Sequence, residues 1–226
     1  MQQGAFVKLM GNGEPGLEPL LLSLAAEIGH VAGQGAAQAL RTDQAHGQLE
    51  HLAASLAGVD SLPPTMQLQL LSSLVLGRFS IDVEPHRVDF GDLRPDVVLG
   101  ERSGHPIVVA AVVAAVAQRA GLPVAVVVGD ANVLLAHRTQ DPPLAISVDR
   151  HGEVLDAREL RDGNLSWRCA HEISAAILDL VLARSETLGL RPVTVRACEL
   201  ATALPLDPHA LAHRDAELSR ALSAWN

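Results

Sequence analysis

The side chains best suited to acid–base or metal chemistry lie in the middle of the chain, where His137 and His151 flank Asp149. Two imidazoles and a carboxylate can exchange protons or bind a transition metal when they converge. Both histidines fall at the ends of adjacent predicted strands, so they could approach each other. Exposed hairpin histidines produce the same pattern more often, and the sequence leaves both interpretations open.

A second histidine pair, His209 and His213, has a four-residue spacing on a predicted helix, with Asp215 beyond it. This spacing puts two imidazoles on one helix face, as in helices that bind zinc. The intervening glutamate and the third histidine of such sites are missing, so we predict no metal site. We expect instead that Arg214 or Asp215 joins the last helix to the core through an ion pair.

The two cysteines, Cys169 and Cys198, form no CxxC pair and have no partner at zinc-finger spacing. The sequence therefore predicts neither a disulfide framework nor a structural metal, and we expect both thiols to pack as small hydrophobic groups. Gly11-Asn12-Gly13 lacks the preceding strand that a phosphate-binding loop requires. We predict no cofactor.

Composition limits the partners of the chain. Its 17 basic residues are outnumbered by 26 acidic ones, and a net charge of -9 repels phosphate backbones, so we expect no nucleic-acid partner. Met1 to Pro15 lacks the features of a secretion signal, and the longest apolar run is too short for a membrane span. These features predict a cytoplasmic protein with no membrane association.

The element that must organise any central site is an apolar helix predicted from Pro106 to Ala120. Proline suits the first helical position because its missing N–H has no intrahelical partner, and Gly121 suits the left-handed position after the end. Nearly every residue between these limits is small or aliphatic. A helix that is apolar on all sides is predicted to be buried.

Short β-rich segments follow this helix, separated by turn-forming residues, and consecutive strands with short loops pair antiparallel. The predicted strands are Val124–Val128, Val133–His137, Leu144–Val148 and Glu153–Leu155. The fold class is therefore α+β, with a buried central helix on an antiparallel sheet.

Helices are predicted on both sides of this core. The N-terminal ones are Leu17–His30, Gln48–Leu56, Thr65–Leu76 and a short one from Pro95 to Glu101, and Phe79–Asp92 has an irregular pattern. The C-terminal ones, Ala170–Leu188, Pro192–Leu204 and Pro208–Ala224, should stack antiparallel as a cap. The predicted division is 1–94 for the N-terminal helical region, 95–166 for the core and 167–226 for the C-terminal cap.

Several segments, in this order, resemble a bacterial transglutaminase-like family. They are Phe79-Ser80-Ile81-Asp82, Leu99-Gly100-Glu101-Arg102-Ser103-Gly104-His105-Pro106-Ile107, Arg119-Ala120-Gly121-Leu122-Pro123, Pro205-Leu206-Asp207-Pro208 and His213-Arg214-Asp215. Members of this family join a helical N-terminal region, a papain-like or transglutaminase-like core and tetratricopeptide-like C-terminal helices. The resemblance implies the same architecture here.

The resemblance also implies where a Cys-His-Asp triad would lie. Counting back from the Gly121-Leu122-Pro123 helix end puts the nucleophile position on Pro106, where the branch most similar to this chain usually has proline too. The base position falls on Asn132, and the third on Ser147, or on Asp149 if the hairpin register differs by two. Proline has no nucleophilic side chain and asparagine cannot take a proton at neutral pH, so the triad is degenerate and no catalytic residue is expected.

We therefore expect a catalytically inactive protein that binds an unknown protein partner or small ligand. The alternative is an enzyme that reuses the cleft for non-thiol chemistry on a small molecule, with His105, His137 or Asp149 as acid–base groups. A loop or helix-cap histidine is the more common explanation for His105. A further alternative is a homo-oligomer formed through the C-terminal helices.

Overall fold

The computed structural model describes residues 4–10, 15–81, 89–129, 132–140, 144–150, 152–155, 165–205 and 208–223, without the side chains of 34–36 and 208–211. Several residues named in the sequence predictions lie outside the described residues, as does the side chain of His209. These residues are Gly11, Asn12, Gly13, Asp82, His151, Leu206, Asp207 and Ala224. The proposed approach of His151 to His137 and the pairing of His209 with His213 therefore remain predictions.

The chain divides into two compact units. A helical unit combines Met1–Asp43 with Ala170–Asn226, and a sheet unit spans Gln44–Cys169. The predicted division into 1–94, 95–166 and 167–226 remains a prediction beside this one, which divides the residues before 95 between both units. The first helices pack with the last ones, and such long-range pairing leaves no mark in local sequence pattern.

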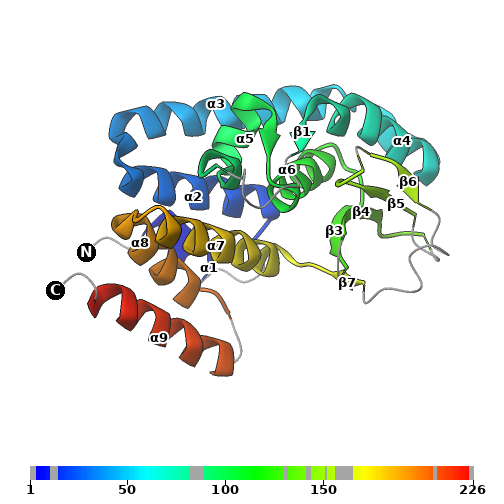
Figure 1. Ribbon diagram of the computed structural model, residues 1–226. Helices are drawn as coiled ribbons and strands as arrows, with labels where there is room; N and C mark the ends of the chain where they lie inside the picture. Colours follow the sequence, from blue (N-terminus) through cyan, green and yellow to red (C-terminus); the bar gives the residue numbers. More distant parts are fainter. Residues whose placement is uncertain are drawn as a thin grey trace. The chain divides into compact units, whose positions relative to one another are not determined.

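The helical unit is built from successive helix pairs. Helix α7 packs against α8, α8 packs against α9, and α2 contacts α1, α7 and α8 (Figure 1). The helices are α1 (Ala5–Met10), α2 (Leu17–Gly29), α7 (Ala170–Thr187), α8 (Arg191–Thr202) and α9 (Pro208–Ser223). The predicted stacking of the last three helices is confirmed.

A long helix, α3 (Gly35–Ala54), begins in the helical unit and ends in the sheet unit. It follows the short π-helical segment η1 (His30–Gln34), where Gly33 has a φ of 84°. That backbone conformation is open to glycine and strained for other residues, so Gly33 turns the chain between α2 and α3. The predicted helix Gln48–Leu56 corresponds to the last part of α3.

Short helices and a parallel strand pair come before the central helix of the sheet unit. They are η2 (Val59–Ser61), α4 (Pro64–Leu74), η3 (Leu76–Arg78), β1 (Ser80–Ile81), η4 (Gly91–Leu93), α5 (Pro95–Glu101) and β2 (Ser103–Gly104). Strand β1 pairs with β2 in parallel register, Ser80 opposite Ser103. This pair brings the residues after η3 beside the residues that lead into the central helix.

The central helix α6 (Pro106–Arg119) is buried along its length from Pro106 to Ala117. His105 is its N-cap residue, and the chain leaves the helix through Gly121, which has a φ of 79°. The Leu122 amide donates to the Ala117 carbonyl at 2.9 Å, which satisfies one of the last free carbonyls of the helix. The predicted helix and its burial are confirmed.

The helix α6 packs beside β3 and β4 of a five-stranded antiparallel sheet in the order β6-β5-β4-β3-β7 (Figure 1). The strands are β3 (Val124–Val128), β4 (Val133–His137), β5 (Ala145–Ser147), β6 (Val154–Leu155) and β7 (Ser166–Trp167). One face carries a small apolar cluster of Val127, Leu134, Ala136, Ala145 and Leu155, with Leu165 packed against it. The predicted α+β class is confirmed, and β7 is an additional edge strand.

In the described part of the chain, every helix falls short of the length and apolar character that crossing a membrane requires.

Candidate functional site

The N-terminus of α6 is the position to which the resemblance assigns the nucleophile of a Cys-His-Asp triad. Pro106 is buried there, and its ring has neither a hydroxyl nor a thiol. The preceding residue, His105, accepts a hydrogen bond from the Ile107 amide through Nδ1 at 3.3 Å. One of the amides that would otherwise stabilise an anion at this helix end is therefore already capped by an imidazole.

Asn132 and Asp149 lie opposite each other at the same end of the sheet. The register pairs Leu134 with Ser147, and continuing it by two residues brings Asn132 opposite Asp149. The Val133 amide, next to Asn132, donates to Asp149 Oδ2 at 2.7 Å. Of the two alternatives for the third position, Asp149 is thus the cross-strand neighbour of Asn132.

The Asp149 carboxyl is half-buried, and its protonation reflects that burial. Desolvation raises the pKa of Asp149, while hydrogen bonds from the backbone amides of Val133 and Asp149 itself, together with the charge of Arg150, oppose the rise. A carboxyl group whose pKa is raised by burial is a common component of acid–base sites and also occurs in structural turns. Among the described residues of the predicted set, Asp149 alone combines a titratable side chain with a place beside Asn132.

Ser147, the other alternative, is fully buried. Its Oγ accepts a hydrogen bond from the Arg150 amide at 3.2 Å, and its backbone bonds to Glu153 and Gly152 across the turn. The hydroxyl therefore closes the turn after β5. It contacts the backbone of its own hairpin.

His137 lies at the other end of β4 and is 1% exposed. Its Nε2 lies 2.9 Å from Gln67 Oε1. The amide nitrogen of Gln67 donates to the carbonyls of Asp60 and Leu62, so Gln67 Oε1 is the acceptor and His137 Nε2 carries the proton. His137 Nδ1 then accepts from the Thr139 hydroxyl at 2.9 Å.

Both ring nitrogens of His137 are thus occupied by protein groups, and burial lowers the pKa of this imidazole, which favours the neutral form. Four residues separate His137 from Val133, which corresponds to roughly 13 Å along a strand. The structure brings Asn132 and Asp149 together and leaves His137 at the far end of the same sheet.

The architecture just described, a buried helix followed by antiparallel strands, is matched by a family model. The model of the transglutaminase-like superfamily matches residues 43–185, which is more than half of the chain. The chain belongs to the transglutaminase-like superfamily. Comparison with curated proteins and with solved structures found no match. The matched range contains α6, the whole sheet and most of α7.

Neither thiol lies at Pro106, Asn132, Ser147 or Asp149, the positions that the resemblance assigns to a triad. Cys169 is exposed, so the prediction that it packs as a small hydrophobic group is wrong, whereas Cys198 is buried as predicted. Cys169 follows β7, which runs antiparallel to β3 from Val128 toward Val126. It therefore lies toward the end of the sheet where His137 pairs with Val124, away from Asn132. Cys198 lies on α8, beyond the matched range. Burial, and then the negative charges of Glu217 and Glu186, raise the pKa of Cys198 to about 11, so this thiol is protonated at neutral pH.

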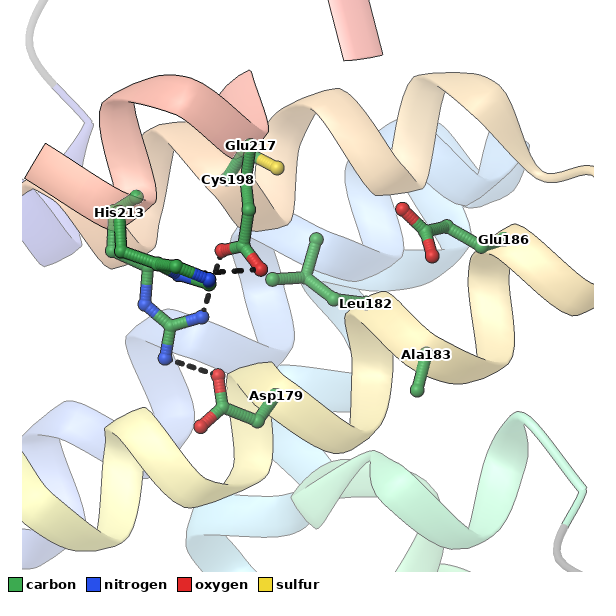
Figure 2. Close-up of a pocket in the computed structure, with 8 residues that line it drawn as sticks. Asp179, Leu182, Ala183, Glu186, Cys198, His213 and Glu217 are labelled. Carbon is green, nitrogen blue, oxygen red and sulfur yellow. Dashed lines mark hydrogen bonds and ion pairs between the residues drawn. The ribbon is translucent and has the colours of Figure 1, made fainter. Parts of the chain in front are cut away.

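A pocket of about 440 Å³ lies in the helical unit between α7, α8 and α9 (Figure 2). Arg214 of α9 forms ion pairs with Asp179 of α7 and, at 2.9 Å, with Glu217. His213 Nδ1 lies 3.6 Å from Glu217 Oε1. Arg214 forms an ion pair as predicted, but the pair joins α9 to α7 within the helical unit, so the prediction that it reaches the core is wrong. The lining residues are Asp179, Leu182, Ala183, Glu186, Cys198, His213, Arg214 and Glu217.

Sequence reasoning missed two arginines at the ends of α5, close to the start of α6 in the transglutaminase-like domain. Arg94 forms a buried ion pair with Asp96, with 2.7 Å between Nη2 and Oδ2. Arg102 lies over the ring of Phe79, with 5.2 Å from Cζ to the ring centroid. Arg102 is part of the segment that carries the family resemblance, and the repeated arginines around this short helix were the available signal.

Among the described residues, no group of three or more His, Cys, Asp and Glu side chains is arranged to hold a metal ion.

Proposed function

We propose that this protein is a catalytically inactive member of the transglutaminase-like superfamily, a pseudoenzyme of the bacterial cytoplasm that acts as a binding or protein-interaction module. The single observation that carries the proposal is Pro106 at the head of α6. Thiol catalysis of this type needs a thiolate at the helix N-terminus, a histidine to deprotonate it and a carboxylate to orient the histidine. Proline provides no group for the first of these roles.

The surroundings of Pro106 support the same interpretation. His105 Nδ1 caps the Ile107 amide, so the imidazole is engaged with the helix backbone. Asn132 has no titratable group that could act as a base. Asp149 holds the Val133 amide rather than a histidine side chain. Each of the three roles is thus either absent or replaced by a contact that stabilises the fold.

The helical unit supports a role in binding. Helices α7, α8 and α9 pack in sequence as helix-pair repeats do, and we propose a tetratricopeptide-like surface for them. Their pocket combines acidic side chains with Arg214 and an apolar floor that includes Leu182. Either a protein partner or a second copy of the chain could use this surface.

The test is an activity assay of the purified full chain with peptide and amine substrates, under reducing conditions. We expect no thiol-dependent protease or transamidase activity above that of a heat-denatured sample. Cys169→Ser and Cys198→Ser should bind whatever the native protein captures from its own cell extract as well as the wild type does. An activity that disappears in either variant would overturn the proposal.

One observation favours a second function, an enzyme that uses non-thiol chemistry on a small molecule. Asp149 combines a raised pKa with a position opposite the exposed Asn132. His105 and His137 fit this role less well, because their described contacts are those of a helix cap and a buried network. A metabolite that the wild type captures and converts, and that Asp149→Asn binds without converting, would favour this enzyme over the inactive module.

A further inference from the structure

Arg102 adopts a backbone conformation that its residue type disfavours. It ends α5 with a φ of 57° and a ψ of 32°, and it is the only residue besides glycines with a positive φ in the described part of the chain. The left-handed region costs a residue with a Cβ about 1 kcal/mol, and glycine usually fills this position after a helix. The arginine side chain is retained here in spite of that cost.

The guanidinium of Arg102 is held in place by the protein but is incompletely satisfied. It lies over Phe79, which is 5% exposed, and the Ser80 amide donates to the Arg102 carbonyl at 2.7 Å. The side-chain atom Nη1 is buried and has no hydrogen-bond partner among the described residues. A buried polar atom without a partner costs about 1–3 kcal/mol, and a charged group costs more.

A second arginine increases the positive charge at this place. Arg78, directly before Phe79 in the chain, lies close enough to lower the pKa of Arg102, after the larger effect of burial. Both influences act in the same direction. In the described part of the chain, neither guanidinium forms an ion pair with a carboxylate, whereas Arg94 at the start of the same helix has Asp96.

We propose that Arg102 and Arg78 form a binding site for an oxyanion, a carboxylate or phosphate group of a small-molecule ligand. A guanidinium presents a planar set of N–H donors that matches such groups, and stacking on an aromatic ring leaves those donors available at the edge. Parallel pairing of β1 with β2 places Phe79 and Arg102 on adjoining segments, four residues before Pro106. Because Nη1 itself is buried, the ligand would bind through the other N–H groups of the partly exposed Arg102 residue.

This site goes beyond the proposed function, because an anion could bind here whether or not the domain is catalytic. If the wild-type protein binds no anion and also has no thiol activity, the anion site is refuted and the proposed inactive domain is not. If the wild-type protein binds the anion and also has thiol activity, the proposed inactive domain is refuted and the anion site is not.

The test is an NMR titration of the full-length protein with inorganic phosphate and, separately, with acetate, at constant pH and ionic strength. We expect the Arg102 Nε–Hε resonance and the backbone amides of Phe79 and Ser80 to shift in a saturable way. If phosphate saturates the shifts at a lower concentration than acetate does, the ligand carries a phosphate group. If acetate saturates them at the lower concentration, the ligand carries a carboxylate group. Absence of saturation with both ions would overturn the proposal.

Variants separate this site from general charge effects. Arg102→Gly suits the left-handed backbone and should abolish the saturable shifts of Phe79 and Ser80. Arg78→Gln should weaken binding roughly tenfold, as loss of one charge-assisted hydrogen bond does. The matched control is Arg150→Gln, since Arg150 is exposed and pairs with Glu153 at 3.6 Å. Equal loss in the control and in Arg102→Gly, both with wild-type melting temperatures, would contradict the site.

Discussion

The two ends of helix α5 carry arginines in opposite circumstances. Arg94, the N-cap residue, is buried with a carboxylate beside it, since Asp96 has no exposed side-chain surface and contacts it through two hydrogen bonds. Arg102, at the other end, has a strained backbone and a buried nitrogen without a partner among the described residues. Within one short helix, the protein neutralises one guanidinium and leaves the other available.

The difference between them indicates which residues serve the fold. A buried ion pair that is complete contributes little net free energy, but removal of one member is strongly destabilising. A buried guanidinium that lacks a hydrogen-bond partner lowers the stability of the folded protein. Its removal should therefore change the free energy of unfolding little and weaken ligand binding strongly. Stability measurements on these positions can therefore separate structural from functional arginines.

The largest effect is expected for Asp96→Asn. The substitution leaves the positive charge of Arg94 buried without the Asp96 carboxylate, and we expect a loss of about 3 kcal/mol in the free energy of unfolding, measured by urea denaturation. The control is Glu153→Gln, which removes an exposed partner of Arg150 and should change stability by less than about 0.5 kcal/mol. Equal losses of stability in the two variants would contradict the claim that the buried ion pair matters more for folding than the exposed one.

A somewhat smaller effect is expected for Gln67→Leu, which tests the other complete buried network. The change leaves the N–H of His137 Nε2 without its acceptor, and we expect destabilisation by about 2 kcal/mol. Adding His137→Phe in the same chain removes the orphaned donor and should restore part of the loss. Independent, additive effects of the two substitutions would contradict the hydrogen bond as described.

The same network predicts a pH dependence. Because the pKa of His137 is lower in the folded protein than the ordinary 6.5, the unfolded chain binds the proton first as pH falls. The stability that His137 contributes is complete above pH 6.5 and declines as pH falls from 6.5 toward the folded pKa, with a slope of at most about 1.4 kcal/mol per pH unit. Unfolding measured across this range should show a shallower slope in His137→Phe. An identical slope in both proteins would exclude His137 as its source.

The smallest effect on stability is expected for Arg102→Gly. Relief of the left-handed backbone gains about 1 kcal/mol, and loss of the contact with Phe79 costs a similar amount, so the net change should stay within about 1 kcal/mol of zero. Thermal unfolding with and without phosphate measures it. A loss of stability as large as that of Asp96→Asn would show that Arg102 serves the fold. The two arginines at the ends of α5 would then have the same role.

Much of the fold could be predicted from local chemistry. Pro64, Pro95, Pro106 and Pro208 each begin a helix, and Gly121 ends the central one, because these residues have restricted or permissive backbones. The alternation of short apolar segments and turns predicted β3, β4, β5 and β6. Two-residue elements such as β7 and the β1–β2 pair were missed, since their pairing depends on residues far away in the chain.

The candidate site was less predictable because it depends on register and distant partners. Counting along the chain left both Ser147 and Asp149 as the third position, and cross-strand pairing from β4 to β5 brings Asp149 opposite Asn132. The buried partner of His137 is Gln67, 70 positions away on α4. An exposed hairpin histidine and a buried one have the same local sequence, and only the packing of α4 distinguishes them.

The imidazole cap on α6 bears on what a cysteine at the head of this helix would meet. A cysteine at position 106 would enter a helix end where the Ile107 amide already bonds to His105. Freeing that amide for a thiolate requires a second substitution, and loss of an N-cap typically costs about 1 kcal/mol of stability. A chain with cysteine at position 106 and a freed Ile107 amide would therefore be less stable than the present one, because it lacks the cap.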